Sequence, residues 1–208
     1  MGHSQSEKKS NHERIVRTAA KRLREKGLEA VAIADVMKEV GLTVGGFYKH
    51  FDSRDDLVVE ALRSASWQRS AQPADASEPS LSLAAFIDEY LSEKHRDRPG
   101  SGCLIGALAG DVARSNKRIR ALATEKVRSV LELIAGLLPD KQDDAGSAFT
   151  AVNGRPELAR KRAALVFSTL VGAIALSRAV SDPSLSDEIL QSVRELLKSI
   201  GTTGELAP

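Results

Sequence analysis

Apolar residues between positions 33 and 51 form two short helical patterns separated by a glycine. The first pattern repeats every three or four residues, the spacing of one helix face, and comprises Ile33, Val36, Met37 and Val40. Gly41 follows it, and a glycine there favours the left-handed conformation that ends a helix. Thr43 is a typical N-cap for a second, very short helix with Phe47 and Phe51 on its inner side. The pattern predicts a helix-turn-helix.

Similar periodic patterns along the rest of the chain predict an all-α fold. Pro- and Ser-rich residues 71–80 are expected to form a linker or loop, and residues 140–155 are irregular. Residues 1–10 are polar and are expected to form a flexible N-terminal arm. The remaining expected helices cover about 11–26, 54–70, 82–91, 103–113, 116–138, 156–181 and 186–200.

The outer face of the second short helix carries residues suited to DNA. Gly45 and Gly46 disfavour a helix by about 1 kcal/mol each, so their presence indicates close backbone approach to another surface. Val44 offers methyl groups for a thymine methyl, and Arg54 is expected to contact a phosphate. The hydrogen-bond donors on this face are Thr43, Tyr48, Lys49 and His50. The alternative is a generic three-helix bundle whose polar side chains face water.

Charge is distributed unevenly between the two ends of the chain. Residues 1–50 contain ten Lys and Arg against six Asp and Glu, an excess of four positive charges. The whole chain has a net charge of +2, so the remaining residues carry −2. This distribution is typical of a DNA-binding end attached to a domain that does not bind DNA.

The sequence argues against several other classes of protein. Cys103 is the single cysteine, and the four histidines lack metal-ligand spacing, so we expect no metal and no cofactor. A nucleophile elbow, a phosphate-binding glycine loop and paired catalytic carboxylates are absent, which argues against an enzyme. No apolar run reaches the roughly 18 residues of a membrane span, and the N-terminus lacks an apolar secretion signal. We therefore predict a cytoplasmic protein without a membrane partner.

The stretch IADVMKEVGLTVGGFYKHFDSRDDL resembles the DNA-binding signature of TetR-type transcriptional regulators. The resemblance covers about residues 11–63 and implies a homodimer that binds operator DNA and a small-molecule effector. It also implies a helix-turn-helix domain over 11–53 and a helical effector-binding and dimerisation domain over 54–208. Three residues depart from the common pattern. Ala32 replaces a capping Thr or Ser, Met37 replaces a small Ala, and Arg54 replaces a Lys.

Cys103 is the residue of the C-terminal part with the most distinctive chemistry. It follows a glycine-rich turn at an expected helix N-terminus, where the helix dipole stabilises a thiolate. This position suggests a sensor of electrophiles or oxidants, but a free cysteine is more often a small buried apolar residue. The large side chains that the resemblance groups around an effector pocket are Trp67, Phe86, Tyr90, Leu108 and Phe167.

The last two predicted helices have wide apolar faces. These faces favour a four-helix interface between two copies of the chain, although packing within one chain is the alternative. The residues assigned to this interface are Ala163, Phe167, Leu170, Ile174, Ile189, Val193, Leu196 and Leu197.

Together these features predict a repressor that binds a palindromic operator as a dimer. An apolar or electrophilic ligand, or modification of Cys103, is expected to release it. The remaining alternative is a helical small-molecule carrier or adaptor without specific DNA binding.

Overall fold

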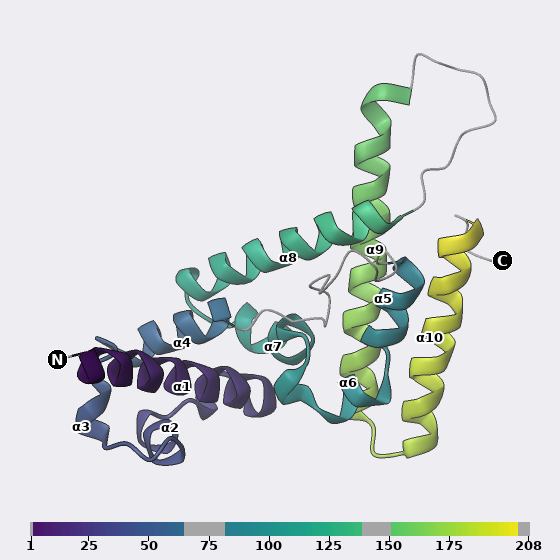
Figure 1. The fold of residues 1–208 in the computed structure, drawn as a ribbon. Coiled ribbons are helices and arrows are strands. Elements are labelled where there is room, and N and C mark those ends of the chain that lie inside the picture. The colour runs from purple at the N-terminus through teal and green to yellow at the C-terminus, as the bar shows by residue number, and fades with distance from the viewer. Residues whose placement is uncertain (1, 65–81, 139–150, 204–208) are drawn as a thin grey trace. The chain divides into compact units, whose positions relative to one another are not determined.

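A computed structural model describes residues 2–64, 82–138 and 151–203, and these residues are helical wherever they form regular structure (Figure 1). The predicted linker at 71–80 and Trp67 lie outside the described residues. In chain order the elements are α1 (Gly2–Lys26), the 3₁₀ turn η1 (Leu28–Ala30), α2 (Ile33–Glu39), α3 (Val44–Phe47), α4 (Arg54–Ser64), α5 (Leu83–Tyr90), α6 (Glu93–Asp97), the 3₁₀ turn η2 (Pro99–Ser101), α7 (Leu104–Ala113), α8 (Lys117–Leu137), α9 (Ala151–Ala179) and α10 (Pro183–Thr203).

The chain divides into two compact units. The described parts of 1–69 and 98–124 form unit 1, and those of 70–97 and 125–208 form unit 2. The predicted boundary at residue 53 does not coincide with this division. The reason is that α4, α7 and the start of α8 pack with the helix-turn-helix, which recruits a distant segment of sequence into the same core.

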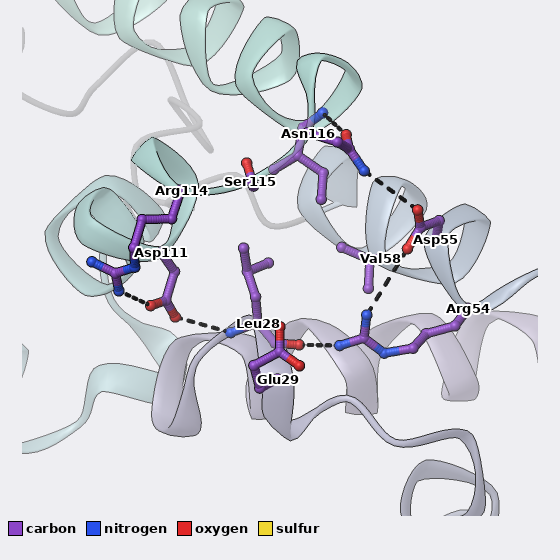
Figure 2. Close-up of a pocket in the computed structure, with 10 residues that line it drawn as sticks. Leu28, Glu29, Arg54, Asp55, Val58, Asp111, Arg114, Ser115 and Asn116 are labelled. Atoms are coloured by element: carbon purple, nitrogen blue, oxygen red, sulfur yellow. Dashed lines mark hydrogen bonds and ion pairs between the residues drawn. The ribbon is translucent and has the colours of Figure 1, made fainter.

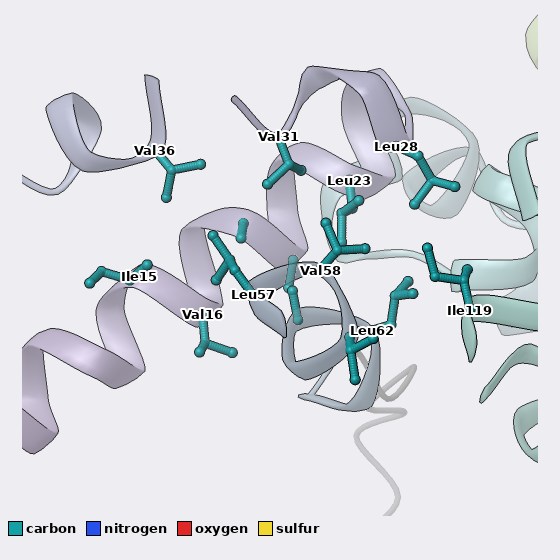
Figure 3. Close-up of a cluster of buried hydrophobic side chains, with 14 of the residues drawn as sticks. Ile15, Val16, Leu23, Leu28, Val31, Val36, Leu57, Val58, Leu62 and Ile119 are labelled. Atoms are coloured by element: carbon teal, nitrogen blue, oxygen red, sulfur yellow. The ribbon is translucent and has the colours of Figure 1, made fainter. Parts of the chain in front are cut away.

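Unit 1 is built around one apolar cluster (Figure 3). Ile15 and Leu23 on α1 and Leu57 on α4 are fully buried in it. Leu108 on α7 and Ile119 on α8 belong to the same cluster. A fully buried Leu or Ile contributes about 1.5–3 kcal/mol relative to an exposed one, so this shared core is the main force that holds α1, α4 and α7 together.

The first helix starts earlier than the sequence indicated. α1 begins at Gly2, so residues 2–10 extend the helix instead of forming a flexible arm. Glu7, Lys8 and Lys9 are exposed and are good helix formers, which allows these turns to form without burying any apolar residue. α9 likewise begins at Ala151, ahead of the predicted start at Pro156.

The turn after α1 is held by α7. Gly27 has φ 87° and ψ 177°, a conformation essentially restricted to glycine. A Cβ at this position would lie 2.5 Å from Oδ2 of Asp111 on α7. The same carboxylate oxygen accepts a hydrogen bond from the backbone N–H of Leu28 at 3.0 Å. Asp111 therefore joins α7 to the turn that precedes the helix-turn-helix.

Unit 2 consists of α5, α6, α9, α10 and the later part of α8. α10 packs against α9 and α5, and α6 packs against α9. Ser82 caps α5 by accepting from Ala85 N–H at 3.1 Å. Arg178 on α9 donates to the carbonyls of His95 and Arg96, and Arg194 on α10 donates to that of Leu91. These bonds satisfy the last carbonyls around α5 and α6.

The segment Glu157–Ala179 of α9 has the length and mean hydropathy, 1.4, of a helix that could cross a membrane. Core helices meet the same criterion. Ala163, Val166 and Leu170 from this segment are buried within unit 2, so its apolar character fits the core of that unit.

Candidate DNA-binding surface and effector region

Local sequence determines the helix-turn-helix turn as predicted. Gly41 takes φ 72°, and Leu42 N–H donates to Met37 carbonyl at 2.8 Å, which closes the turn after α2. Thr43 is extended, and its hydroxyl accepts from Gly46 N–H at 3.3 Å, so Thr43 is the N-cap of α3. Phe47 is fully buried and anchors α3 to the core of unit 1.

The opposite side of α3 projects into solvent. Val44 is 47% exposed and Tyr48 64% exposed, which is unusual for large apolar or aromatic side chains. Lys49 is also exposed. No described atom outside the neighbouring backbone lies within 4 Å of where a Gly45 Cβ would stand. The side predicted to contact DNA is therefore accessible, with a bare backbone at its centre.

His50 lies at the edge of this surface and is half-buried. Its ring is 5.8 Å from that of His12, and its Nδ1 is buried without a hydrogen-bond partner among the described residues. Burial lowers the pKa of His50 below its ordinary value, and the positive charges of His12, Lys8 and Lys49 act in the same direction. A lowered pKa favours the neutral form of His50 at neutral pH.

Arg54 makes structural contacts that the sequence did not indicate. Its Nε donates to the carbonyl of Val31 at 2.8 Å. Its Nη2 donates to the carbonyl of Leu28 (Figure 2). Leu28 begins η1, and Val31 lies between η1 and α2, so Arg54 holds the start of α4 against this segment. The phosphate contact of Arg54 stays a prediction.

Two arginines of α1 hold the helix-turn-helix in place. Arg22 pairs with Asp35 at 3.1 Å and Glu39 at 2.8 Å, both on α2. Arg14 donates to the carbonyl of Val40 at 2.8 Å, at the end of α2. Sequence spacing offers no signal for these contacts, since the partners lie 13 to 26 residues away.

Comparison with known proteins identifies the family. Residues 15–61 match the model of bacterial regulatory proteins of the tetR family. An uncharacterised HTH-type transcriptional regulator of Mycobacterium tuberculosis strain H37Rv is 31% identical over 186 residues, which cover 89% of this chain and 93% of that protein. The chain belongs to the TetR family. It is a transcriptional regulator with a DNA-binding helix-turn-helix, not an enzyme.

Solved structures of TetR regulators have the same fold. A TetR regulator from Chloroflexus aurantiacus has a TM-score of 0.73 at 22% identity, with 95% of this chain and 97% of that chain covered. The reduced form of NemR from Escherichia coli has a TM-score of 0.68 at 19% identity, with 91% and 96% covered. The predicted all-α fold with a TetR-type helix-turn-helix domain is confirmed.

Cys103 occupies the N-cap position of α7 and is 4% exposed. Its side chain makes no capping hydrogen bond. Arg24 lies close enough for electrostatic interaction with Cys103, and its guanidinium donates to the carbonyl of Gly100 at 2.7 Å. Burial lowers the pKa of Arg24, whereas electrostatic interactions with Glu25 and Cys103 oppose this shift. Arg24 is a neighbour of Cys103 that sequence distance concealed.

The residues predicted to surround an effector fall into different compact units. Phe86, Tyr90 and Phe167 form a buried aromatic cluster in unit 2, with ring centroids 6.1 Å apart for Phe86–Tyr90 and 6.5 Å for Tyr90–Phe167. Cys103 and Leu108 belong to unit 1. The sequence did not reveal this division, because residues 98–124 belong to unit 1 although the preceding residues 70–97 belong to unit 2.

The residues predicted for the dimer interface differ in their burial within unit 2. Most of them face the interior of unit 2, where they are buried. The buried ones are Ala163, Phe167, Leu170, Ile174 and Leu197. Ile189 and Val193 are half-buried, and Leu196 is 55% exposed. The sequence identified the apolar faces of both helices, but it did not distinguish the inner from the outer side.

Proposed function

We propose that this TetR-family chain is an effector-responsive repressor that binds a palindromic operator as a homodimer. The observation that carries the proposal is the exposed face of α3, where Val44, Tyr48 and Lys49 surround a bare Gly45 backbone. Such a face suits the major groove, with Lys49 at a phosphate and Val44 at a thymine methyl. The half-buried His50 at the edge of this face would add a ring N–H donor for a phosphate oxygen.

Dimerisation would use the outer faces of α9 and α10. Leu158, Leu165 and Leu176 are exposed along α9 at intervals of seven and eleven residues, which place them on one helix face. Leu185 and Leu196 are exposed along α10 at a matching interval of eleven. A second copy of this chain is the occupant that fits best, since a two-fold interface between identical helices is self-complementary. Two heads would then read half-sites about one helical turn apart.

A mobility-shift experiment tests the proposal. Purified protein is mixed with DNA upstream of its coding region, at about 0.15 M salt, with competitor DNA. We expect a discrete shift that Lys49→Ala weakens strongly. The matched control is Lys94→Ala, which removes an exposed lysine of α6 in unit 2. Equal binding by wild type and Lys49→Ala would refute the assigned surface. Failure to select any fragment genome-wide would favour the carrier or adaptor.

We further propose that Cys103 links the effector response to redox or electrophile chemistry. NemR, a protein of similar fold, has been crystallised in a reduced form. Here, Arg24 lies close to Cys103, and Cys103 occupies the N-cap position of α7. Cys103 is nearly buried, so its reaction would displace α7, which Asp111 joins to the helix-turn-helix.

The Cys103 proposal is tested by release of bound operator. A quinone or hypochlorite is added to the operator complex, and release is compared between wild type and Cys103→Ser. We expect release from wild type only. Equal release from the serine variant would show that Cys103 is a core residue without a sensor role.

A protein with these partners acts in the cytoplasm, where bacterial DNA lies.

A further inference from the structure

A cavity of about 290 Å³ lies within unit 1, away from the exposed side of α3. It is bounded by η1, the first turn of α4, the end of α7 and the start of α8 (Figure 2). Its base is apolar and consists of Leu28, Val58 and Ile119, each less than a tenth exposed. The volume is at the small end of ligand pockets, so an occupant is a small molecule.

The lining of this cavity contains one more carboxylate than it has positively charged side chains. Arg114 pairs with Asp111, with Nη2–Oδ1 at 3.0 Å. Arg54 lies beside Asp55, with Nη1–Oδ1 at 3.9 Å, while its other nitrogens donate to backbone carbonyls. Among the described residues, Glu29 makes no hydrogen bond or ion pair. The lining therefore carries a net negative charge, located at Glu29.

The neutral polar groups of the lining retain acceptors. Asn116 donates one amide N–H to Asp55 at 3.3 Å, and its carbonyl oxygen accepts from Ile119 N–H. Ser115 donates its hydroxyl to Val112 carbonyl at 2.7 Å, which leaves its oxygen lone pairs available. These oxygens can accept from an occupant that carries hydrogen-bond donors.

The two helix N-termini at the cavity do not reverse this preference. Asn116 caps α8 through its side chain. The first turn of α4 contains Asp55 and Asp56, and Ser53 accepts from Asp56 N–H at 3.1 Å. The partial positive charges of both helix ends are thus already opposed by oxygen atoms.

From this arrangement we propose that the cavity binds a small organic ammonium ion, such as a primary amine with a short apolar body. The ammonium donates to Glu29 and to Oδ1 of Asp55, the oxygen that does not accept from Asn116. The apolar body lies over Leu28, Val58 and Ile119. This site is separate from α3, from Cys103 and from the aromatic cluster of unit 2. It connects α4 of the head to α7 and α8 through one ligand.

Calorimetry of the full-length protein with benzylammonium, in low salt at neutral pH, tests the site. Benzyl alcohol and benzoate have nearly the same shape and serve as neutral and anionic probes. We expect benzylammonium to bind more tightly than either. Glu29→Gln and Asp55→Asn should each weaken it by about tenfold, the loss typical of a charge-assisted hydrogen bond.

Glu13→Gln removes an exposed carboxylate of α1 outside the lining and is the matched control. It should bind benzylammonium like the wild type. Equal binding by wild type and Glu29→Gln, tighter binding of benzoate, or absence of binding would each overturn the proposal. Circular dichroism shows whether each variant is folded. Glu29→Gln should retain operator binding, so failure of the amine site is distinguishable from failure of the proposed regulator.

Discussion

Replacement of Gly27 by alanine tests the contact between α7 and the turn that precedes the helix-turn-helix. At φ 87° and ψ 177° the backbone lies in a region that is essentially restricted to glycine, and alanine there costs about 1–3 kcal/mol. The new Cβ would also stand 2.5 Å from Oδ2 of Asp111. The Asp111 side chain can rotate away at little energetic cost, but this rotation breaks its hydrogen bond to Leu28 N–H, a loss of about 1 kcal/mol.

We therefore expect Gly27→Ala to lower the free energy of unfolding by about 2–4 kcal/mol, with a shift in Tm of about 3 °C for each kcal/mol. Gly41→Ala is the matched control. Gly41 also has positive φ, at 72°, but nothing lies within 4 Å of its added Cβ. Its cost is limited to the left-handed backbone, about 1–2 kcal/mol. Thermal unfolding at one protein concentration compares the variants, because the proposed dimerisation would make Tm concentration-dependent.

A double-mutant cycle isolates the contact itself. Asp111→Ala removes the Leu28 hydrogen bond, about 1 kcal/mol, and also removes the atom that a Gly27 Cβ would meet. Once Asp111 is absent, Gly27→Ala should cost only its backbone strain. The double variant should therefore be about 1 kcal/mol more stable than the sum of the two single changes predicts. Strict additivity would refute the role assigned to Asp111.

Three further predictions concern DNA binding, assembly and pH. Lys49→Ala should reduce the slope of the logarithm of operator affinity against the logarithm of salt concentration by about 1. Arg54→Ala should lower Tm and leave that slope unchanged. A changed slope for Arg54→Ala would indicate that Arg54 does contact a phosphate. Leu176→Glu should yield monomers in sedimentation experiments, because a charge would be buried at the proposed interface. The control Gln191→Glu should remain dimeric. A dimeric Leu176→Glu variant would place the interface elsewhere. Burial lowers the pKa of His95, so the unfolded chain binds a proton first, and stability should decrease as pH falls below about 6.5. His95→Asn should flatten this dependence in urea unfolding, and an unchanged slope would assign it to other groups.

The local features of the head were readable from the sequence. Periodic apolar residues predicted α2, while Gly41 and Thr43 predicted the turn and the cap of α3, because each depends on neighbours within a few residues. The glycine pair and Tyr48 similarly predicted the exposed side of α3. The family resemblance supplied the expectation of a small-molecule effector, which no local pattern contains.

Contacts between distant segments were decided only by tertiary structure. An arginine can reach a phosphate or a carbonyl with the same side chain, and only the approach of α4 to the loop before α2 directs Arg54 to the carbonyls. A wide apolar helix face has two possible partners, and packing within unit 2 selected the side containing Leu170 and left Leu176 exposed. Sequence period records which residues share a helix face, but the choice of what covers that face depends on the free energy of the whole packed unit.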